Sequence, residues 1–274
     1  MMLECKEAVT GAPVIRCSAL LDTVFCGDNT EILSGFPAEC VDLVVTSPPY
    51  DDLRTYGNHS WDFAALAEQL ARVLKPGGVI VWVIADATVN GSETGTSMRQ
   101  ALHFKDVCGL NLHDTMVWIK TGQGACGSVK AYWQNWEYCF VLSKGVPKTF
   151  NPIEDRKNVS VGKMTAPSGK GKDGLWKYSR PIETKEYGRR FNNWTIDAES
   201  NPEHPAPFPE ALAKGHVLSW SNPGDLVLDP FAGSGTTLKS AKELNRRYVG
   251  IEINEPYISV IKNRLAQDAL PLGV

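Results

Sequence analysis

Four short, unbroken apolar runs constrain the fold of this chain more than any other feature of its sequence. They are residues 41–46, 79–84, 225–229 and 248–253. Runs of this length without polar alternation are typical of strands buried on both faces of a parallel sheet. Segments with helical periodicity lie between or after them, at 63–74, 235–245 and 256–267. Strands that alternate with helices predict an α/β fold with a doubly wound, mostly parallel sheet.

Two other segments depart from this alternation. Residues 115–120 and 137–144 predict an antiparallel pair at one edge of the sheet. Residues 145–200 have no periodicity and are rich in Lys, Gly, Pro, Ser and Asn. So long an aperiodic stretch is unusual in a compact domain unless it is functional, so we interpret it as an insertion into a single domain spanning 1–274. Pro76-Gly77-Gly78 predicts the end of the helix before it.

The net charge of −3 hides an uneven distribution of charge along the chain. Residues 144–190 contain 12 Lys and Arg against 5 Asp and Glu, whereas the rest contains 16 against 26. A charged run is often only a solvated loop. It also suits a surface that binds phosphates, because Lys and Arg displace condensed counterions from nucleic acids. Charge alone leaves both interpretations open.

The sequence favours a reducing compartment without membrane attachment. The first residues contain no apolar segment of the kind that signal peptides have, and the run 79–89 is too short to span a bilayer. Seven cysteines are scattered without a C-x-x-C pair, which is typical of core residues rather than of disulfides or a metal site. We therefore expect a cytoplasmic protein with no membrane partner and no metal.

A glycine-rich turn, "DPFAGSGTT" at 229–237, follows the third apolar run and begins a helical segment. Glycines there let a ligand approach the backbone closely, and the helix start offers free N–H groups. Glu252 ends the next predicted strand, where an acid can bind both hydroxyls of a ribose. The turn lacks the lysine of triphosphate-binding loops. It predicts an adenosine-like ligand with little phosphate, although an ordinary strand–helix loop is the plainer alternative.

The stretch "TSPPY", residues 46–50, ends the first predicted strand. Two prolines fix φ and remove N–H donors, so a rigid strand end is one interpretation. The other is a reactive site, because open α/β sheets bind ligands beyond the carboxyl ends of their strands. The glycine-rich turn is expected at the same edge.

These two motifs together resemble those of amino-directed DNA methyltransferases. Residues 229–235 resemble the S-adenosylmethionine motif of that family, and Ser47-Pro48-Pro49-Tyr50 resembles its catalytic motif. The catalytic motif comes first, as in the β group, and the basic insertion lies where that group has its target recognition region. Residues 26–33 and 204–212 resemble further parts of the cofactor pocket. The resemblance implies a Rossmann-like methyltransferase fold, S-adenosylmethionine as cofactor, and double-stranded DNA as partner.

The resemblance also implies roles in catalysis for Ser47, Pro48, Pro49 and Tyr50. The Ser47 hydroxyl and the Pro48 carbonyl would accept the two protons of an exocyclic amine. Tyr50 would stack on a base that has been turned out of the duplex. Serine in the first position resembles cytosine-N4 enzymes, and adenine N6 is the alternative target.

Cofactor contacts are implied for eleven residues: Asp28, Phe208, Asp229, Phe231, Ala232, Gly233, Ser234, Gly235, Thr236, Glu252 and Ile253. Asp28 is also consistent with a helix cap, and Phe208 with ordinary core packing.

Candidates for DNA contact lie in or beside the basic insertion: Arg156, Lys163, Lys170, Lys172, Arg180, Arg189, Arg190, Asn192 and Asn193. Most of them would contact phosphate or solvent, because phosphate contacts outnumber base contacts. Residues 133–136, "WQNW", would line either a base pocket or the core.

Several broader alternatives stay open at this point. Similar enzymes are commonly dimers, so the resemblance suggests a homodimer, and a cognate restriction endonuclease is a partner that the sequence leaves undecided. An enzyme of the same fold could act on RNA instead. A DNA-binding module without catalysis is a third hypothesis, which the complete glycine-rich turn and Glu252 disfavour.

Overall fold

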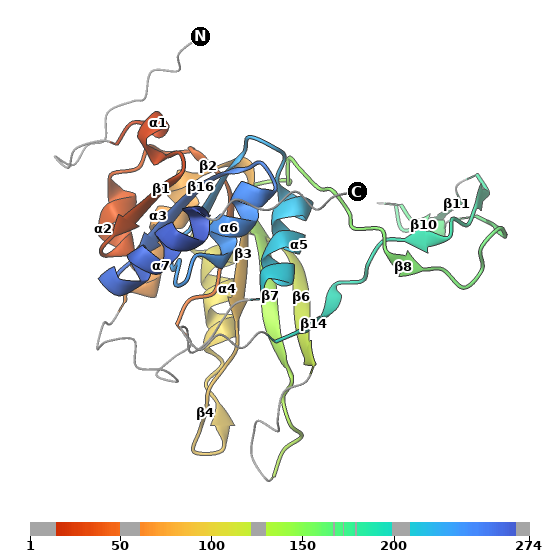
Figure 1. Cartoon of the computed structure of the whole chain (residues 1–274). Helices are drawn as coiled ribbons and strands as arrows, with labels where there is room; N and C mark the ends of the chain where they lie inside the picture. Colours follow the sequence, from red (N-terminus) through yellow and green to blue (C-terminus); the bar gives the residue numbers. More distant parts are fainter. Residues whose placement is uncertain are drawn as a thin grey trace. The chain divides into compact units, whose positions relative to one another are not determined.

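The structure, a computed structural model, describes residues 15–49, 61–121, 130–166, 168–171, 173–178, 180–198 and 209–266. Its centre is an eight-stranded sheet (Figure 1). In spatial order the strands are β1 (Thr23–Cys26), β16 (Arg247–Glu252), β15 (Leu226–Asp229), β2 (Val41–Thr46), β3 (Leu74–Ile84), β7 (Trp136–Ser143), β6 (Asn111–Thr121) and β14 (Asn193–Asp197). Every neighbouring pair is parallel except the two that β7 forms with β3 and β6. The predicted doubly wound, mostly parallel sheet is confirmed.

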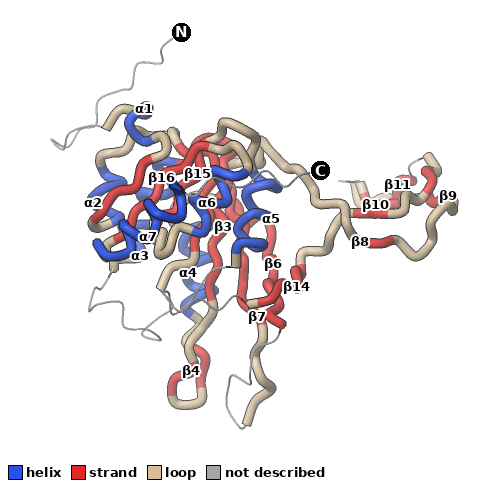
Figure 2. Tube along the Cα trace, in the orientation of Figure 1, coloured by secondary structure: helices blue, strands red, loops and turns tan. Residues whose placement is uncertain are grey.

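Helices cover both faces of this sheet (Figure 2). One face carries α2 (Asn29–Ser34), α3 (Phe63–Val73) and α4 (Thr96–Asp106), and the other carries α5 (Glu210–Trp220), α6 (Thr236–Glu243) and α7 (Glu255–Ala266). A single turn, α1 (Cys17–Leu20), precedes β1, and β4 (Thr88–Val89) forms a short hairpin with β5 (Ser92–Glu93). The three predicted helices are confirmed. Within the described ranges, no helix is long and apolar enough to cross a membrane.

The junction between α3 and β3 differs from the prediction. The helix ends at Val73, before the Pro-Gly-Gly segment, and β3 begins at the next residue. The register against β2 then shifts, since Val41 pairs with Leu74 but Leu43 pairs with Val79. The extra residues of β3 form a bulge, where a proline without an N–H is tolerated. Pro76-Gly77-Gly78 therefore lies within the start of a strand.

The predicted antiparallel pair is present as β6 and β7, but it does not form the edge of the sheet. Strand β14 lies outside β6 and parallel to it, within the stretch that the sequence assigned to the insertion. The Trp118 indole N–H donates to the Ile196 carbonyl (3.0 Å), and Trp194 is buried against Gly215 of α5. A five-residue strand with one buried side chain has too little apolar pattern to be predicted.

The chain divides into two compact units: residues 152–191, and the sheet with its helices, formed by the rest. The larger unit binds both residues that flank the smaller one. The Asn151 side chain donates to the carbonyls of Leu218 and Ser221 (both 3.1 Å). The Asn192 side chain donates to Asp114 (3.1 Å) on β6.

In its described residues the smaller unit contains three short antiparallel ladders, and it covers fewer residues than the predicted insertion 145–200. The ladders are β8 (Arg156–Lys157) with β13 (Tyr187–Gly188), β9 (Met164–Thr165) with β12 (Ile182–Glu183), and β10 (Ser168–Lys170) with β11 (Trp176–Tyr178).

Candidate active site

The two motifs singled out in the sequence lie on adjacent strands. Strand β2 leads into Ser47-Pro48-Pro49, and β15 ends at Asp229, where the glycine-rich turn begins. The two strands are parallel neighbours, so both motifs leave the sheet at its carboxyl edge. The Thr46 hydroxyl donates to Asp229 (2.7 Å), and the Thr237 hydroxyl donates to the Val45 carbonyl (3.2 Å). These hydrogen bonds hold the two strand ends together.

The Ser-Pro-Pro segment is only partly accessible. Pro48 is buried, whereas Ser47 and Pro49 are half-buried. Ser47 directly follows Thr46, whose hydroxyl is bound to the first residue of the glycine-rich turn. Tyr50 lies outside the described residues. The catalytic motif therefore begins directly after Thr46, the residue that is hydrogen-bonded to the first residue of the glycine-rich turn.

Asp229 stabilises the turn from inside the protein. It is only 5% exposed, and one carboxylate oxygen accepts from both the Thr46 hydroxyl and the Phe231 N–H (3.1 Å). Burial raises the pKa of this carboxyl group to about 6, although its hydrogen bonds favour the charged form. Asp229 thus binds the neighbouring strand and the turn backbone at once.

The turn itself requires glycine at two positions. Gly233 and Gly235 have φ values of +52° and +83°, in the left-handed region that side chains disfavour. Gly235 also precedes the first residue of α6 as its N-cap. A Cβ at this position would lie 3.1 Å from Ile261 of α7, so the helix packs where only glycine leaves room. Ala232 is buried, and its N–H donates to the Ile251 carbonyl (2.9 Å).

Glu252 connects the turn to the next strand. It is buried, and its two carboxylate oxygens accept from the N–H groups of Gly233 (2.8 Å) and Asn254 (2.9 Å). Burial raises the pKa of Glu252, while these backbone hydrogen bonds oppose the shift. The adjacent Ile253 is 37% exposed and offers apolar surface to a ring.

Asp28 lies at the same edge and caps a helix. Its carboxylate accepts from the Glu31 N–H (2.9 Å) at the start of α2. Strand β1 pairs with β16, and the Gly27 N–H donates to the Glu252 carbonyl (3.0 Å). Asp28 is therefore a helix cap, as one of the two interpretations predicted. It lies beside the end of β16, which carries Glu252. Phe208 lies outside the described residues.

An arginine of α7 binds the side chains of Ser234 and Thr236. One guanidinium nitrogen of Arg264 donates to the Ser234 hydroxyl (2.8 Å), the Ser234 carbonyl (2.9 Å) and the Thr236 hydroxyl (3.2 Å). Ser234 and Thr236 are both buried. Their hydroxyls fix the shape of the turn. No local sequence signal marks Arg264, because its partners are 28 to 30 residues away.

Aromatic packing supports the turn from the other side. The Phe231 ring meets Trp61 edge to face at 5.1 Å and lies 6.5 Å from Trp82 in the core. The buried Asn29 side chain donates to the Pro230 carbonyl (3.2 Å). Neither Trp61 nor Asn29 was a candidate from the sequence, since nothing local marks such long-range contacts.

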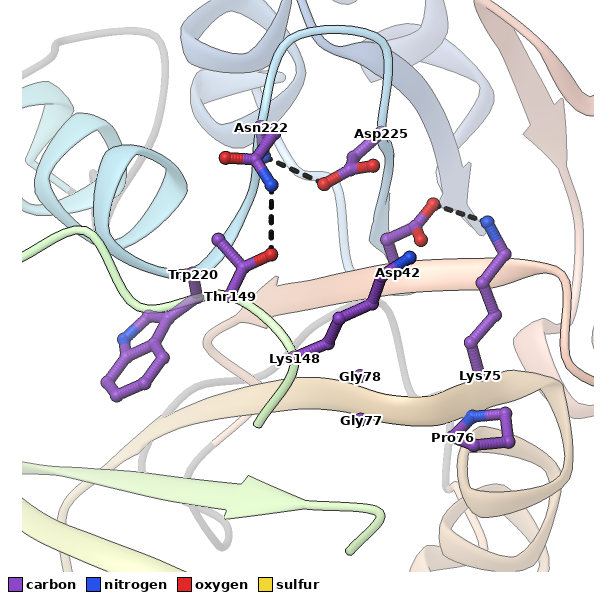
Figure 3. A pocket seen from close by; sticks show the side chains of 10 residues that line it. All are labelled: Asp42, Lys75, Pro76, Gly77, Gly78, Lys148, Thr149, Trp220, Asn222 and Asp225. Carbon is purple, nitrogen blue, oxygen red and sulfur yellow. Dashed lines mark hydrogen bonds and ion pairs between the residues drawn. The ribbon is translucent and has the colours of Figure 1, made fainter. Parts of the chain in front are cut away.

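A separate hollow lies at the amino ends of β2, β3 and β15, opposite the carboxyl ends of the strands where both motifs lie (Figure 3). Lys75 forms an ion pair with Asp42 (2.6 Å). Asn222 binds Asp225 through its N–H (2.7 Å) and Thr149 through its side chain (3.0 Å). These polar groups satisfy one another, which indicates a structural role. In open α/β sheets the ligand site is at the carboxyl edge, where both motifs lie.

Comparison with known proteins agrees with this placement. The family model of N6/N4 DNA methylases matches residues 41–263. The orphan methyltransferase M.BamHII of Bacillus amyloliquefaciens is 47% identical over 236 residues, which cover 82% of this chain and 88% of that protein. The type II methyltransferase M.BglII of Bacillus subtilis is 30% identical, with 88% and 68% covered. The chain belongs to the N6/N4 DNA methylase family.

Solved structures share the fold of this methylase. The PvuII DNA methyltransferase (cytosine-N4-specific) superposes with a TM-score of 0.65 at 21% identity, covering 91% of this chain and 88% of that one. A putative DNA modification methylase from Thermus thermophilus, solved with S-adenosylmethionine, superposes with a TM-score of 0.60 at 25% identity, covering 89% and 93%. The methylase is an S-adenosylmethionine-dependent DNA methyltransferase that modifies an exocyclic amine.

The residues of the methylase predicted to contact DNA fall into four groups. Arg156 and Arg190 are bound within the smaller unit: Arg156 donates to the Arg189 carbonyl (2.9 Å) and lies over the Phe191 ring (4.6 Å), and Arg190 forms an ion pair with Asp155. Asn192 and Asn193 belong to the larger unit, and Lys172 lies outside the described residues. The exposed candidates are Lys163, Lys170, Arg180 and Arg189.

The segment before β7 reaches the same edge of the sheet as the motifs, because β7 runs antiparallel to β3. Trp133 is 70% exposed, which argues against a core role for it. Trp136 is half-buried and meets Tyr138 edge to face at 4.7 Å. Lys120 of β6 forms an ion pair with the buried Glu137 beside them. A base pocket at 133–136 stays a prediction.

Proposed function

We propose that this methylase transfers a methyl group to the N4 amine of a cytosine turned out of double-stranded DNA. One observation carries the proposal: the Ser-Pro-Pro segment and the glycine-rich turn leave adjacent parallel strands, joined by the bond from Thr46 to Asp229. Neighbouring strands lie about 4.8 Å apart. An amine held by one motif can therefore come within about 3 Å of a methyl donor held by the other.

Ser47 and Pro48 would prepare the amine. Its lone pair is delocalised into the ring, which makes it a poor nucleophile. If the Ser47 hydroxyl and the Pro48 carbonyl accept its two protons, the nitrogen becomes more tetrahedral and the lone pair is freed. The prolines fix φ and keep the carbonyl aimed at the amine. Tyr50 would stack on the extruded base, as the flipped bases of other enzymes stack on aromatic rings.

S-adenosylmethionine, when bound, supplies a methyl group on a positively charged sulfur. With the cofactor bound, the amine nitrogen held by Ser47 and Pro48 would accept this methyl group, and the electron pair of the carbon–sulfur bond would remain on the sulfur. The methylated amine then loses one proton to solvent, so the chain needs no strong base. Catalysis by Ser47 and Pro48 would be mainly positioning.

We propose that Glu252 holds the ribose hydroxyls of the cofactor and that Ile253 packs on the adenine. The position of Glu252 at the carboxyl end of β16, bound to Gly233 of the turn, and the exposed side chain of Ile253 support these roles. The proposed role of Asp229 and of residues 231–236 is to shape the loop around the methionine part. Asp28 and Phe208 would complete the pocket.

The preference for cytosine rests on Ser47, which is typical of the cytosine-N4 motif. A relative named as a DNA adenine methyltransferase, YhdJ of Escherichia coli, is 30% identical, so adenine N6 is the competing product. The test is mass spectrometry of nucleosides from plasmid DNA incubated with the enzyme and deuterated methyl donor. We expect labelled N4-methylcytosine. Labelled N6-methyladenine alone would show that the base assignment is wrong.

Ser47→Ala tests the catalytic role. We expect kcat to fall about a hundredfold, the scale at which a single hydrogen-bonding partner of a transition state contributes. Calorimetry should show unchanged affinity for S-adenosylmethionine, because Ser47 is not among the cofactor residues. Ser34→Ala on α2 is a matched control and should keep the wild-type rate. A near-normal rate for Ser47→Ala would remove Ser47 from the mechanism.

Three further proposals concern the setting of the enzyme. Exposed Met98 and Leu102 lie one turn apart on α4, which supports a homodimer that buries them. The names of the type II relatives support a restriction–modification context with a cognate endonuclease. Four described cysteines, Cys26, Cys40, Cys108 and Cys139, are free thiols, which supports a place in the cytoplasm. Sedimentation of the purified protein tests the dimer, and a monomer at micromolar concentration would contradict it.

A further inference from the structure

A short β-hairpin projects from the carboxyl edge of the sheet, in the connection between β3 and α4 (Figure 1). It consists of β4 and β5, with Thr88 opposite Glu93 and Val89 opposite Ser92. Strand β3 is the parallel neighbour of β2, so the hairpin leaves the sheet one strand away from Ser47. Neighbouring strands lie about 4.8 Å apart. The hairpin therefore begins beside the position proposed for the reacting base.

The turn of this hairpin is encoded locally. Asn90 and Gly91 connect the two strands, with φ values of +52° and +81°. Two consecutive positive φ values are typical of a two-residue type I′ turn, for which Asn-Gly is a preferred sequence and whose twist matches that of the strands. The Thr94 N–H closes the hairpin by donating to the Ala87 carbonyl (2.9 Å). The sequence of the tip thus fixes its shape.

Asp86 holds the base of the hairpin. Its carboxylate accepts from the Thr94 hydroxyl (3.2 Å), the Ser97 N–H (2.9 Å) and the Ser97 hydroxyl (2.5 Å). Thr94 follows β5, and Ser97 lies in the first turn of α4, so one side chain ties the end of β3 to the hairpin and to the helix. The Arg99 guanidinium also donates to the Thr94 carbonyl (2.6 Å). These bonds hold the hairpin firmly on the sheet.

The tip of the hairpin is exposed and uncharged. Ala87 at its base is only 5% exposed, whereas Val89 is 56% exposed. Residues 88–92, "TVNGS", are all exposed and include no charged side chain. Phosphates are bound mainly by cationic side chains, so this tip is not suited to them. A single exposed apolar side chain is ordinary on a protein surface. What distinguishes Val89 is its firm support beside the catalytic motif.

We propose that Val89 enters the base stack of the duplex and occupies the space that the target base leaves when it turns out towards Ser47. Apolar side chains of other DNA-binding proteins wedge between base steps in this way. The three residues from Asp86 to Val89 span about 10 Å when extended, which exceeds the ~8 Å depth of a DNA groove. The tip can therefore reach the bases while the edge of the sheet stays at the rim of the groove. The inference rests on the proposed function, because it assumes a base turned out of duplex DNA.

Such a wedge would act on extrusion of the base rather than on methyl transfer. Turning a base out of a duplex breaks its pair and its stacking, and the cost is least for a base that is already mispaired. A side chain that fills the vacated space offsets part of this cost. Loss of Val89 should therefore slow the reaction on a paired target base and have little effect on a mispaired one.

Two 30-base-pair duplexes test this difference. Both contain the site that modification-sensitive sequencing finds in plasmid DNA treated with the wild-type enzyme, and one has a mismatch opposite the target base. Relative to wild type on the same duplex, Val89→Ser should lower kcat/KM about tenfold when the target is paired and less than about twofold when it is mispaired. Val89→Leu should keep most of the activity on both. Val107→Ser, exposed at the end of α4, is the matched control and should leave both rates unchanged.

A fluorescent base gives a direct measure of unstacking. The probe is the paired duplex with 2-aminopurine next to the target base, because its fluorescence rises when stacking is lost. The wild-type enzyme should raise the signal, and Val89→Ser should raise it clearly less at saturating protein. An equal rise with both proteins would overturn the inference.

Other outcomes would also overturn it. An equal loss of kcat/KM on the two duplexes would give Val89 a general structural role. Sedimentation of Val89→Ser should match that of the wild-type protein, and dissociation of a dimer would place Val89 between two copies of the chain instead. Calorimetry should show unchanged affinity for S-adenosylmethionine, since the hairpin is not part of the cofactor site.

The wedge and the proposed function fail in different ways. If the wild-type protein and Val89→Ser methylate the paired duplex at the same rate, only the wedge inference falls. If the wild-type protein binds S-adenosylmethionine but methylates no DNA, the proposed function falls, and the inference falls with it.

Discussion

Single side chains hold the glycine-rich turn of this methylase in shape, and Arg264, which the motif did not predict, binds two of its residues. Its guanidinium satisfies two hydroxyls and a carbonyl of Ser234 and Thr236, while Ile261 of the same helix packs on Gly235. Helix α7 therefore holds the turn in shape, and we propose that Arg264 is a positioning residue for cofactor binding.

Arg264→Met should weaken S-adenosylmethionine binding about tenfold, or ~1.4 kcal/mol, because two buried hydroxyls lose their donor. Titration calorimetry measures this directly. Lys262→Met changes an exposed cation on the same helix and should leave the affinity unchanged. Arg264→Lys should restore part of the loss. Wild-type affinity in Arg264→Met, with only a lower melting temperature, would reduce Arg264 to a packing role.

At the scale of elements, the close approach of α5 to β14 depends on Gly215. A Cβ there would lie 2.6 Å from the Trp194 ring. Overpacking costs about 1–3 kcal/mol, whereas replacing glycine by alanine within a helix gains about 1 kcal/mol. Gly215→Ala should therefore lower the free energy of unfolding by about 1 kcal/mol and the melting temperature by about 3 °C. Scanning calorimetry checks the shift.

The matched background for this substitution is Trp194→Phe, whose smaller ring leaves room for the methyl group. In that background Gly215→Ala keeps its helical gain without the clash, so it should raise the melting temperature. The same sign in both backgrounds would show that the contact with Trp194 is not the cause.

The individual strands also show how much of the fold could be predicted from the sequence. The strands 41–46, 225–229 and 248–253 were predictable because unbroken apolar runs mark buried parallel strands. Strand β14 was not, since its one buried residue, Trp194, finds its partners on α5 and β6. The short ladders of residues 152–191 could not be predicted, and the sequence showed only a basic aperiodic stretch there. Such ladders depend on cross-strand register rather than on periodicity.

The site was predictable to a similar depth. Both motifs and their common edge follow from local sequence and the parallel arrangement. The bonds from Thr46 to Asp229 and from Arg264 to Ser234 join residues far apart in the chain, and no local pattern encodes them. Asp28 illustrates a mixed outcome, since the helix cap exists and its proposed cofactor contact is still to be tested.

For the whole molecule, His216 links stability to pH. It is fully buried on α5, stacks on Trp194 (4.6 Å), and neither ring nitrogen has a hydrogen-bond partner among the described residues. Burial lowers its pKa from 6.5 to about 3, so the folded protein keeps it neutral. Between these values the unfolded chain binds more protons than the folded one. The contribution of His216 to the free energy of unfolding is therefore at its full value above pH 6.5, and it decreases as the pH falls towards 3.

His216→Phe should remove this dependence. Relative to wild type, its free energy of unfolding should rise by about 1.4 kcal/mol for each pH unit below 6.5, or about 2 kcal/mol at pH 5. The difference is measured by urea unfolding at pH 5 and at about pH 7.5, where the histidine is neutral in both states. Asp229 and the other carboxyl groups are common to both proteins, so their contribution to the pH dependence cancels in the difference. A difference that is equal at the two pH values would contradict the assignment.

Asn151 and Asn192 have a consequence for how such an enzyme can diversify. Each binds the catalytic body with its own side chain, one at the end of α5 and the other on β6. The forty residues between them could then be replaced by another segment, because the larger unit already binds the residue on either side of it. A lineage built this way could exchange its target recognition region, the role that the resemblance implies for these residues, while its methyl-transfer chemistry is inherited unchanged.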